Sequence, residues 1–97
     1  RGVEAAGAFS VVLEGIPSSI AKKITQALTI PTIGIGTGPS CDGQILVFHD
    51  MLGINDGFIP KFVKKYVDIA ALAAQGLNEY IKEVQEGSFP SQEYEYK

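Results

Sequence analysis

Short apolar runs separated by polar turns occupy the first third of the chain and predict two strands joined by a helix. Residues 8–14 form the first run, which only Ser10 interrupts. A nearly continuous apolar stretch with β-branched residues is typical of a parallel strand that is buried on both faces. After a turn at Pro17, apolar residues recur with the spacing of one helical face, and these are Ile20, Ile24, Ala27 and Leu28. The pattern therefore predicts a strand followed by an amphipathic helix.

Pro31 ends this helix, and residues 32–36 have the composition of a second short strand. Glycines at alternate positions of that strand indicate that another backbone or a ligand approaches closely. Strand, helix and strand over residues 8–36 form one βαβ unit, for which a right-handed crossover is expected.

Residues 44–48 predict a third strand, which ends at His49 and Asp50. Only residues 37–43 separate it from the second strand. A parallel crossover usually needs about a dozen residues or more, so the spacing favours an antiparallel hairpin. A parallel pair joined by one abbreviated helical turn remains the alternative.

The second half of the chain predicts a loop and one long helix. Breakers at Gly53, Gly57 and Pro60 indicate that residues 51–65 form a loop, with a short helix around Phe62 and Val63. Apolar residues then recur at helical spacing over residues 66–86, and these are Ile69, Ala70, Ala73, Leu77, Tyr80, Ile81 and Val84. Gly87 is the expected C-cap, and residues 88–97 are expected to form a polar, mobile tail.

Length and the first residues change this picture. The chain has 97 residues, which allows one domain at most. It begins with Arg1 rather than Met, and residues 1–7 match the end of a helix that closes on Gly7. Because a domain rarely opens halfway through a helix, we expect a fragment or cleavage product of a larger protein.

Composition and charge exclude several functional classes. The formal net charge is -3, so no basic face for nucleic acid is expected. The acidic excess lies in residues 79–97, whereas residues 1–78 carry six acids and six bases. A single cysteine, Cys41, excludes an internal disulfide and a multi-cysteine zinc site, and it fits a reducing, cytoplasmic compartment. We expect neither a transmembrane helix nor a signal peptide.

Glu14 is the sharpest candidate for chemistry, because it ends the first predicted strand. A carboxylate at the carboxyl end of a buried parallel strand points into the crevice where α/β proteins bind ligands. Partial burial there would make it a usable proton acceptor. The competing interpretation is a strand-end glutamate that faces solvent or pairs with a lysine, and spacing alone favours that interpretation.

The glycines at positions 34, 36 and 38 form a second candidate, because they resemble a phosphate-binding loop. No Gly-Lys-Ser/Thr follows them, and no long helix opens after them to offer its N-terminus. A tight turn or close packing is therefore the favoured explanation.

The remaining candidates are His49, Asp50 and Cys41. His49 and Asp50 could bind a ligand or, with Glu14, a metal, but one histidine and two distant acids are a weak metal signal. A hydrogen-bonded strand terminus is favoured for them. Cys41 lies in a loop with no histidine beside it, so a nucleophilic role is not favoured.

Several of these stretches together resemble the carboxyl-terminal part of the ketopantoate hydroxymethyltransferases (3-methyl-2-oxobutanoate hydroxymethyltransferases). The stretches that carry the resemblance are residues 7–17, 21–25, 30–38, 41–53 and 87–90. They cover nearly the whole chain. The sequence departs from the family at Thr37 and in the tail beyond Pro90.

The resemblance implies an α/β fold in which residues 1–97 are the carboxyl-terminal three strands and helices of a (β/α)8 TIM barrel. That single barrel domain is incomplete in this chain, since a barrel typically has about 250 residues. The resemblance also implies that the second and third strands are parallel neighbours with a very short connection, contrary to the loop-length rule.

The family transfers a hydroxymethyl group from 5,10-methylenetetrahydrofolate to 3-methyl-2-oxobutanoate, which gives 2-dehydropantoate for pantothenate and coenzyme A biosynthesis. The reaction is Mg²⁺-dependent and of the aldol type, and a glutamate in a strand-ending Leu-Glu-x-x-Pro motif accepts the C3 proton. Leu13, Glu14 and Pro17 match that motif, so the resemblance assigns the proton acceptor to Glu14.

The resemblance places the metal ligands and a substrate-binding lysine on earlier strands, so Mg²⁺ would be bound by a missing upstream part. Asp42 and Asp50 are not expected to replace those ligands. The implied partners are that upstream part, the small 2-oxo acid and further copies, commonly in a decamer, and the isolated chain would be inactive. The alternative is a non-catalytic partial-barrel assembly or binding module, in which the helix over residues 66–86 mediates contacts.

Overall fold

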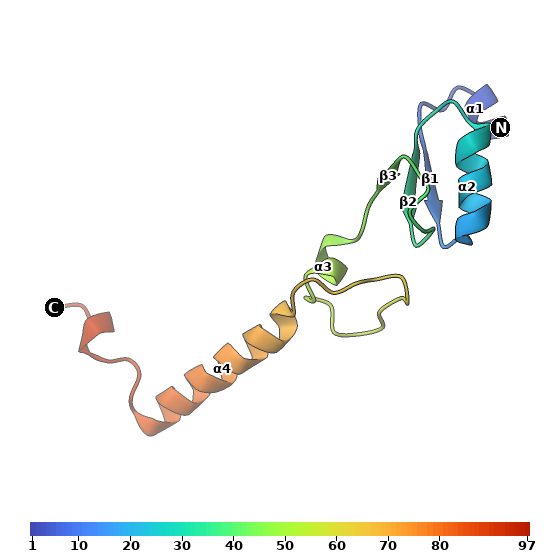
Figure 1. Ribbon diagram of the computed structural model, residues 1–97. Coiled ribbons are helices and arrows are strands. Elements are labelled where there is room, and N and C mark those ends of the chain that lie inside the picture. The colour runs from blue at the N-terminus through green and yellow to red at the C-terminus, as the bar shows by residue number, and fades with distance from the viewer.

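Three parallel strands and four α-helices make up the computed structural model, which describes residues 1–97. In chain order the elements are α1 (Gly2–Ala5), β1 (Val11–Glu14), α2 (Ser18–Ala27), β2 (Thr32–Ile35), β3 (Gly43–Gln44), α3 (Phe48–Met51), α4 (Ile69–Glu86) and a 3₁₀ turn, η1 (Gln92–Tyr94). The sheet order is β1-β2-β3, and both pairs are parallel. The predicted βαβ unit and the α/β class are confirmed (Figure 1).

Helix α2 covers one face of the sheet and provides most of its packing. Ala21 of α2 is completely buried, and the Thr25 hydroxyl lies 2.8 Å from that of Thr32 on β2. The contact with Thr25 shows that Thr32 faces α2, and its partner in register, Val11, faces α2 as well. Because side chains alternate along a strand, Leu13 lies on the same face of β1 as Val11. Leu13 is 8% exposed, whereas Val12, on the opposite side, is 55% exposed. The prediction that β1 is buried on both faces is therefore wrong within this chain, because Val12 and Glu14 on its second face are exposed.

Strands β2 and β3 are parallel, as the family resemblance implies, and the antiparallel hairpin favoured by loop length is wrong. Because the strands are short, residues 36–42 have to run back along β2 by only about 10 Å, the length of roughly three strand residues, before β3 begins beside Ile33. At the end of this return, the Asp42 carboxylate accepts hydrogen bonds from the Thr32 backbone N–H at 2.8 Å and from its hydroxyl at 3.2 Å. The loop is thus pinned to the start of β2 without a crossover helix.

The third strand is shorter than predicted, and His49 and Asp50 lie in helix α3 rather than at a strand end. Gly36 has a φ of +67°, so the backbone turns away after Ile35 and β2 offers nothing further to pair with. The last bond of the ladder is from the Ile45 N–H to the Gly34 carbonyl at 3.0 Å. The short helix expected around Phe62 is also wrong, since residues 61–62 form a turn.

Helix α4 confirms the predicted long helix, although it begins at Ile69 rather than at residue 66. The Asp68 carboxylate caps it by accepting from the Ala71 N–H at 3.3 Å. Gly87 ends it at a φ of +79°, as predicted. None of the helices has the combination of length and apolar character needed to cross a bilayer.

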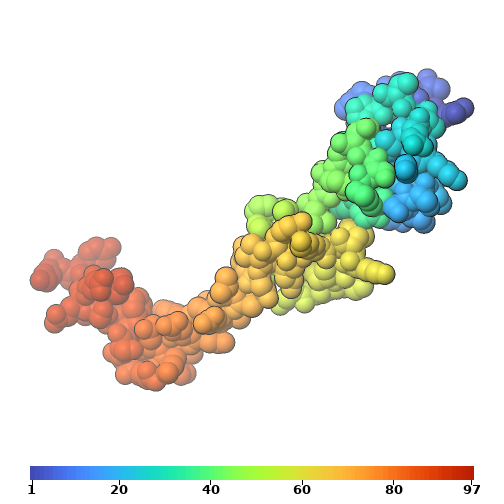
Figure 2. All heavy atoms as spheres, viewed as in Figure 1, coloured from blue at the N-terminus to red at the C-terminus, as the bar shows by residue number.

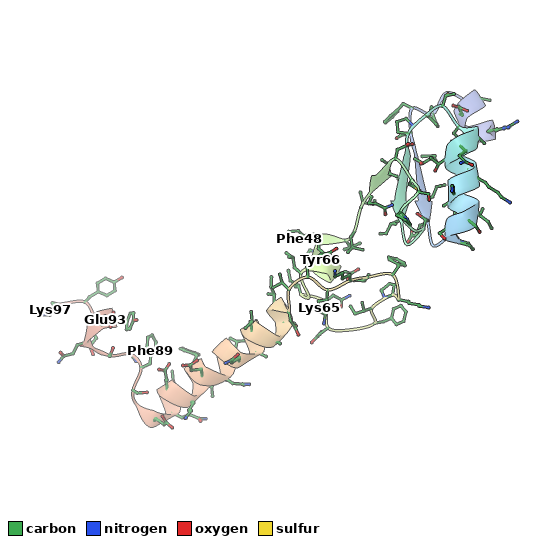
Figure 3. The ribbon with its side chains drawn as sticks, viewed as in Figure 1. Phe48, Lys65, Tyr66, Phe89, Glu93 and Lys97 are labelled. Atoms are coloured by element: carbon green, nitrogen blue, oxygen red, sulfur yellow. The ribbon has the colours of Figure 1, made fainter.

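The chain is elongated, with extents of 68 × 29 × 17 Å, and α4 projects away from the sheet (Figures 1 and 2). Its radius of gyration is 22.4 Å, whereas a compact domain of this length has about 13 Å. Only 7 of 97 residues are buried, and none of them lies in α4. At the far end, Phe89 packs against Tyr80 and Tyr94 (Figure 3). The chain has the elements of an α/β unit but leaves an apolar sheet face and an apolar helix face uncovered.

Candidate functional site

Glu14 is the last residue of β1 and lies at the carboxyl edge of the sheet, where the sequence places it. It is opposite Ile35 in the register, and the next N–H, from Gly15, donates to the Ile35 carbonyl at 3.0 Å. Because Leu13 faces α2, Glu14 lies on the side of the sheet that α2 leaves open. Its side chain is exposed within this chain.

The open face around Glu14 is apolar. Val12 precedes it by two residues on the same side of β1. Ile45, directly after β3, lies on this side because its neighbour Gln44 is in register with Gly34 on the α2 side. Both apolar side chains are half-exposed. A layer packed on this face would remove water from around the carboxylate.

An open cleft of about 700 Å³ lies at the same edge of the sheet, and Gly15, the residue after Glu14, is part of its lining. Its lining consists of Gly15, Gly36, Gly38, Pro39, Gln44, Lys61 and Phe62. Lys61 and Phe62 come from the loop after α3, which returns toward the strand ends (Figure 1). Lys61 is the one charged residue of this lining.

The glycines at positions 34, 36 and 38 allow tight turns and close packing, which is the explanation that the sequence favoured. At Gly36, a Cβ would lie only 2.5 Å from the Phe62 ring, and at Gly38, where φ is +76°, it would lie 2.5 Å from the Ser18 Cβ. At Gly34, a Cβ would collide with the Thr37 hydroxyl oxygen. These glycines therefore let a loop and the start of α2 approach the strand ends.

Comparison with known proteins identifies the family. The family model of ketopantoate hydroxymethyltransferase matches residues 1–92. The chain belongs to the ketopantoate hydroxymethyltransferase family. It is 59% identical over 96 residues to the 3-methyl-2-oxobutanoate hydroxymethyltransferase of Geotalea uraniireducens, and 62% identical over 95 residues to that of Desulforapulum autotrophicum.

The chain spans about a third of the length of these curated relatives. The two alignments cover 99% and 98% of this chain but 36% of each relative. A third relative, the 3-methyl-2-oxobutanoate hydroxymethyltransferase of Clostridium novyi, is 57% identical over 97 residues, which are 35% of its length. The segment shared with the ketopantoate hydroxymethyltransferases is thus a part of a larger unit in these proteins.

The acidic residues weighed as metal ligands serve local structure in this family member. Asp42 holds Thr32, and the Asp50 carboxylate accepts from the Asn55 side-chain amide at 3.2 Å. The His49 ring stands edge-on to Phe48, with ring centroids 5.8 Å apart. No group of three histidine, cysteine or acidic side chains in the chain is arranged to hold a metal ion.

Cys41 is a free thiol in the loop before β3. Its sulfur lies 3.5 Å from the Thr37 hydroxyl, which is completely buried within the loop. This contact packs the loop after β2 against Gly34. The structure thus gives Cys41 a packing role and brings no histidine to it.

Two features of the structure were missed from the sequence. Glu4 accepts hydrogen bonds from the Thr29 N–H at 2.8 Å, the Ile30 N–H at 3.1 Å and the Thr29 hydroxyl, and these donors lower the pKa of its carboxyl. The partners lie 25 and 26 positions away, and no local pattern signals them. Lys61 was also missed, although Pro60 before it indicates a loop that could return to the sheet.

Proposed function

We propose that this chain provides the general base of an enzyme that transfers a hydroxymethyl group from 5,10-methylenetetrahydrofolate to 3-methyl-2-oxobutanoate. The product would be 2-dehydropantoate for pantothenate and coenzyme A biosynthesis. Membership of the ketopantoate hydroxymethyltransferase family supports the reaction class. The observation that carries the proposal is the position of Glu14, which ends β1 at the carboxyl edge of the sheet and directly precedes Gly15 of the cleft lining.

In the proposed reaction, the Glu14 carboxylate accepts the proton from C3 of the oxo acid. The electron pair of the broken C–H bond forms the enolate. Water adds to the methylene carbon of the donor as its two bonds to the folate nitrogens break, and the two protons of the water end on these nitrogens, so tetrahydrofolate leaves and the carbon is at the oxidation level of formaldehyde. C3 attacks this carbonyl carbon to make the new C–C bond, and the resulting alkoxide takes the proton from Glu14.

The proposed enzyme is a (β/α)8 barrel whose remaining strands come from an upstream part of the same protein. The uncovered apolar face of β1 to β3 would become part of the barrel interior, and α2 would belong to the outer ring. The Mg²⁺ that the family implies is assigned to the upstream part, because the acids of this chain do not form a cation site. We also propose a cytoplasmic homo-oligomer, a decamer as in the family.

A second candidate function is a non-catalytic assembly module. The observation that favours it is α4, where Leu77 and Ile81 are 63% and 50% exposed and have no partner in the chain. In that case Glu14 would be incidental, and its replacement would leave the chemistry of any assembled enzyme unchanged.

Deuterium exchange at C3 of 3-methyl-2-oxobutanoate, without folate, distinguishes these functions in the complete enzyme. Glu14→Gln keeps the shape of the side chain and removes its basicity, so exchange should fall by about 10²- to 10⁴-fold. Glu79→Gln on exposed α4 is the matched control and should leave exchange unchanged. Exchange within a few-fold of the parent in a folded Glu14→Gln variant would remove Glu14 from the base role.

A further inference from the structure

The loop between α3 and α4 is fixed at its base and reaches the strand ends at Phe62. At the base, the Tyr66 N–H donates to the Met51 carbonyl at 2.8 Å. Residues 56–65 make only one backbone–backbone hydrogen bond, which lies within the loop, and none to the sheet. The contact of this loop with the strand ends is therefore made by side chains.

The Phe62 ring lies against Gly36, where the backbone turns away at the end of β2. A Cβ at Gly36 would lie 2.5 Å from the Phe62 Cδ2 and 2.6 Å from its Cγ, so this edge of the ring is packed directly on the turn. Gly36, Gln44 and Phe62 line both clefts, of about 700 and 490 Å³, so hollow space flanks the contact on two sides. Removal of the ring would join these hollows and leave the turn without that support.

The turn at Gly36 is joined directly to the backbone of the proposed base. Ile35 is the partner of Glu14 in the register, and its carbonyl accepts from the Gly15 N–H at 3.0 Å. This carbonyl belongs to the planar peptide group that links Ile35 to Gly36, so its direction is fixed together with the Gly36 nitrogen. The bond is the last between β1 and β2, and it determines where the chain leaves the sheet after Glu14.

We propose that Phe62 is a positioning residue for Glu14. Its ring holds the peptide before Gly36, and the carbonyl of that peptide holds the backbone directly after the base. The inference rests on the proposed function for the role of Glu14. Phe62 has no group that exchanges a proton, so it acts through geometry alone, and a displacement of about 1 Å at a reacting group can cost about 100-fold in rate.

Folate-free exchange at C3 of the oxo acid tests this role in the complete enzyme, with Phe58→Ala as the matched control. Both substitutions remove a phenyl ring from the same loop, but Phe58 is 87% exposed whereas Phe62 is 37% exposed. In Phe62→Ala, the maximal rate of exchange should fall by about 10- to 100-fold, while the oxo acid concentration for half-maximal rate changes by less than about twofold. Phe62→Tyr should restore the rate, because the ring meets Gly36 through Cβ, Cγ and Cδ2 and not through its far end.

Combination with Glu14→Gln tests whether Phe62 acts through Glu14. Where the base is already absent, Phe62→Ala has nothing left to position and should lower the exchange rate no further. Three results would overturn the inference: the same fold-decrease with and without Glu14→Gln, parental exchange in Phe62→Ala, or a loss that Phe62→Tyr does not restore.

Hydrogen–deuterium exchange of the Gly15 backbone N–H, followed by mass spectrometry, separates this inference from the proposed function. The bond to the Ile35 carbonyl protects this N–H, so it should exchange about tenfold faster in Phe62→Ala and at the parental rate in Phe58→Ala. Unchanged protection in Phe62→Ala would overturn the inference even where Glu14 proves to be the base. Parental C3 exchange in Glu14→Gln would instead refute the proposed function, and the Gly15 N–H would still decide whether Phe62 holds the backbone there.

Discussion

The Glu4 carboxyl connects two segments through hydrogen bonds alone, and this makes it a reporter of the fold. Its Oε1 accepts hydrogen bonds from the backbone N–H groups of Thr29 and Ile30, just before β2 begins. The Thr29 hydroxyl is the largest cause of its lowered pKa, followed by the Thr29 N–H. Because the folded pKa lies below the unfolded value, the stabilisation is present above the unfolded pKa and is lost as the pH falls through the folded one.

Replacement of the first of these donors should therefore raise the titration midpoint of Glu4. In Thr29→Val, the hydroxyl donor is absent while both backbone donors remain, so the midpoint should move toward the ordinary glutamate value of about 4.3. Carboxyl chemical shifts followed by NMR across pH 2 to 7 measure it. Ser19→Ala, on the exposed start of α2, is a control that should leave the midpoint unchanged. An identical midpoint in Thr29→Val would show that the hydroxyl does not hold the carboxylate.

Single residues differed in how far the sequence could place them. Glu14 was predictable, because an apolar run that stops at a carboxylate defines both the strand and its end. The cleft position of Lys61 was not, since it depends on a loop that turns back over Gly36 after α3. Glu4 was missed for the same reason, as its partners are distant in sequence.

At the scale of elements, periodicity found β1, α2, β2 and α4 but failed for the connection between β2 and β3. The usual length of a parallel crossover assumes strands of ordinary length, and β3 has two residues. The short return is possible because Asp42 replaces the packing of a helix with hydrogen bonds to Thr32. Pairing to β2 is limited by the turn at Gly36, which apolar character in residues 45–47 could not reveal.

Removal of the Asp42 carboxylate should destabilise this connection. Thr32 is completely buried, so Asp42→Ala leaves its N–H without a partner, and an unpaired buried donor costs about 1–3 kcal/mol. Denaturant unfolding of the complete enzyme measures the loss. Asp56→Ala, in the exposed loop after α3, is the control and should change stability by less than about 0.5 kcal/mol. Equal effects of the two substitutions would contradict the role of Asp42.

At the scale of the whole molecule, the elements are present but do not close a core. Half-exposed apolar side chains on β1, after β3 and on α4 need a covering surface that this chain does not provide, and these are Val12, Ile45, Val47 and Leu77. The amphipathic pattern predicted where these faces lie. It could not predict what covers them, because a periodic pattern identifies an apolar face and not its partner.

The chain alone should therefore not unfold as a cooperative unit. Its few buried residues and exposed apolar faces predict a broad, concentration-dependent thermal transition by circular dichroism, with association at higher concentration. Addition of the upstream polypeptide should sharpen the transition and raise its midpoint. A cooperative, concentration-independent melt of the 97-residue chain would contradict this prediction.

The short return between β2 and β3 also has a kinetic consequence. Parallel strands ordinarily pair late, because a long loop must close before any contact forms. Here Thr32 and Asp42 are only 10 residues apart, and Ile33 pairs with Gly43 at the same separation. Loop closure over this distance takes about 10–100 ns, so β2 and β3 can find each other as quickly as the strands of a hairpin. This pair is therefore suited to be the first tertiary contact of the segment during folding, on which β1 and α2 then assemble.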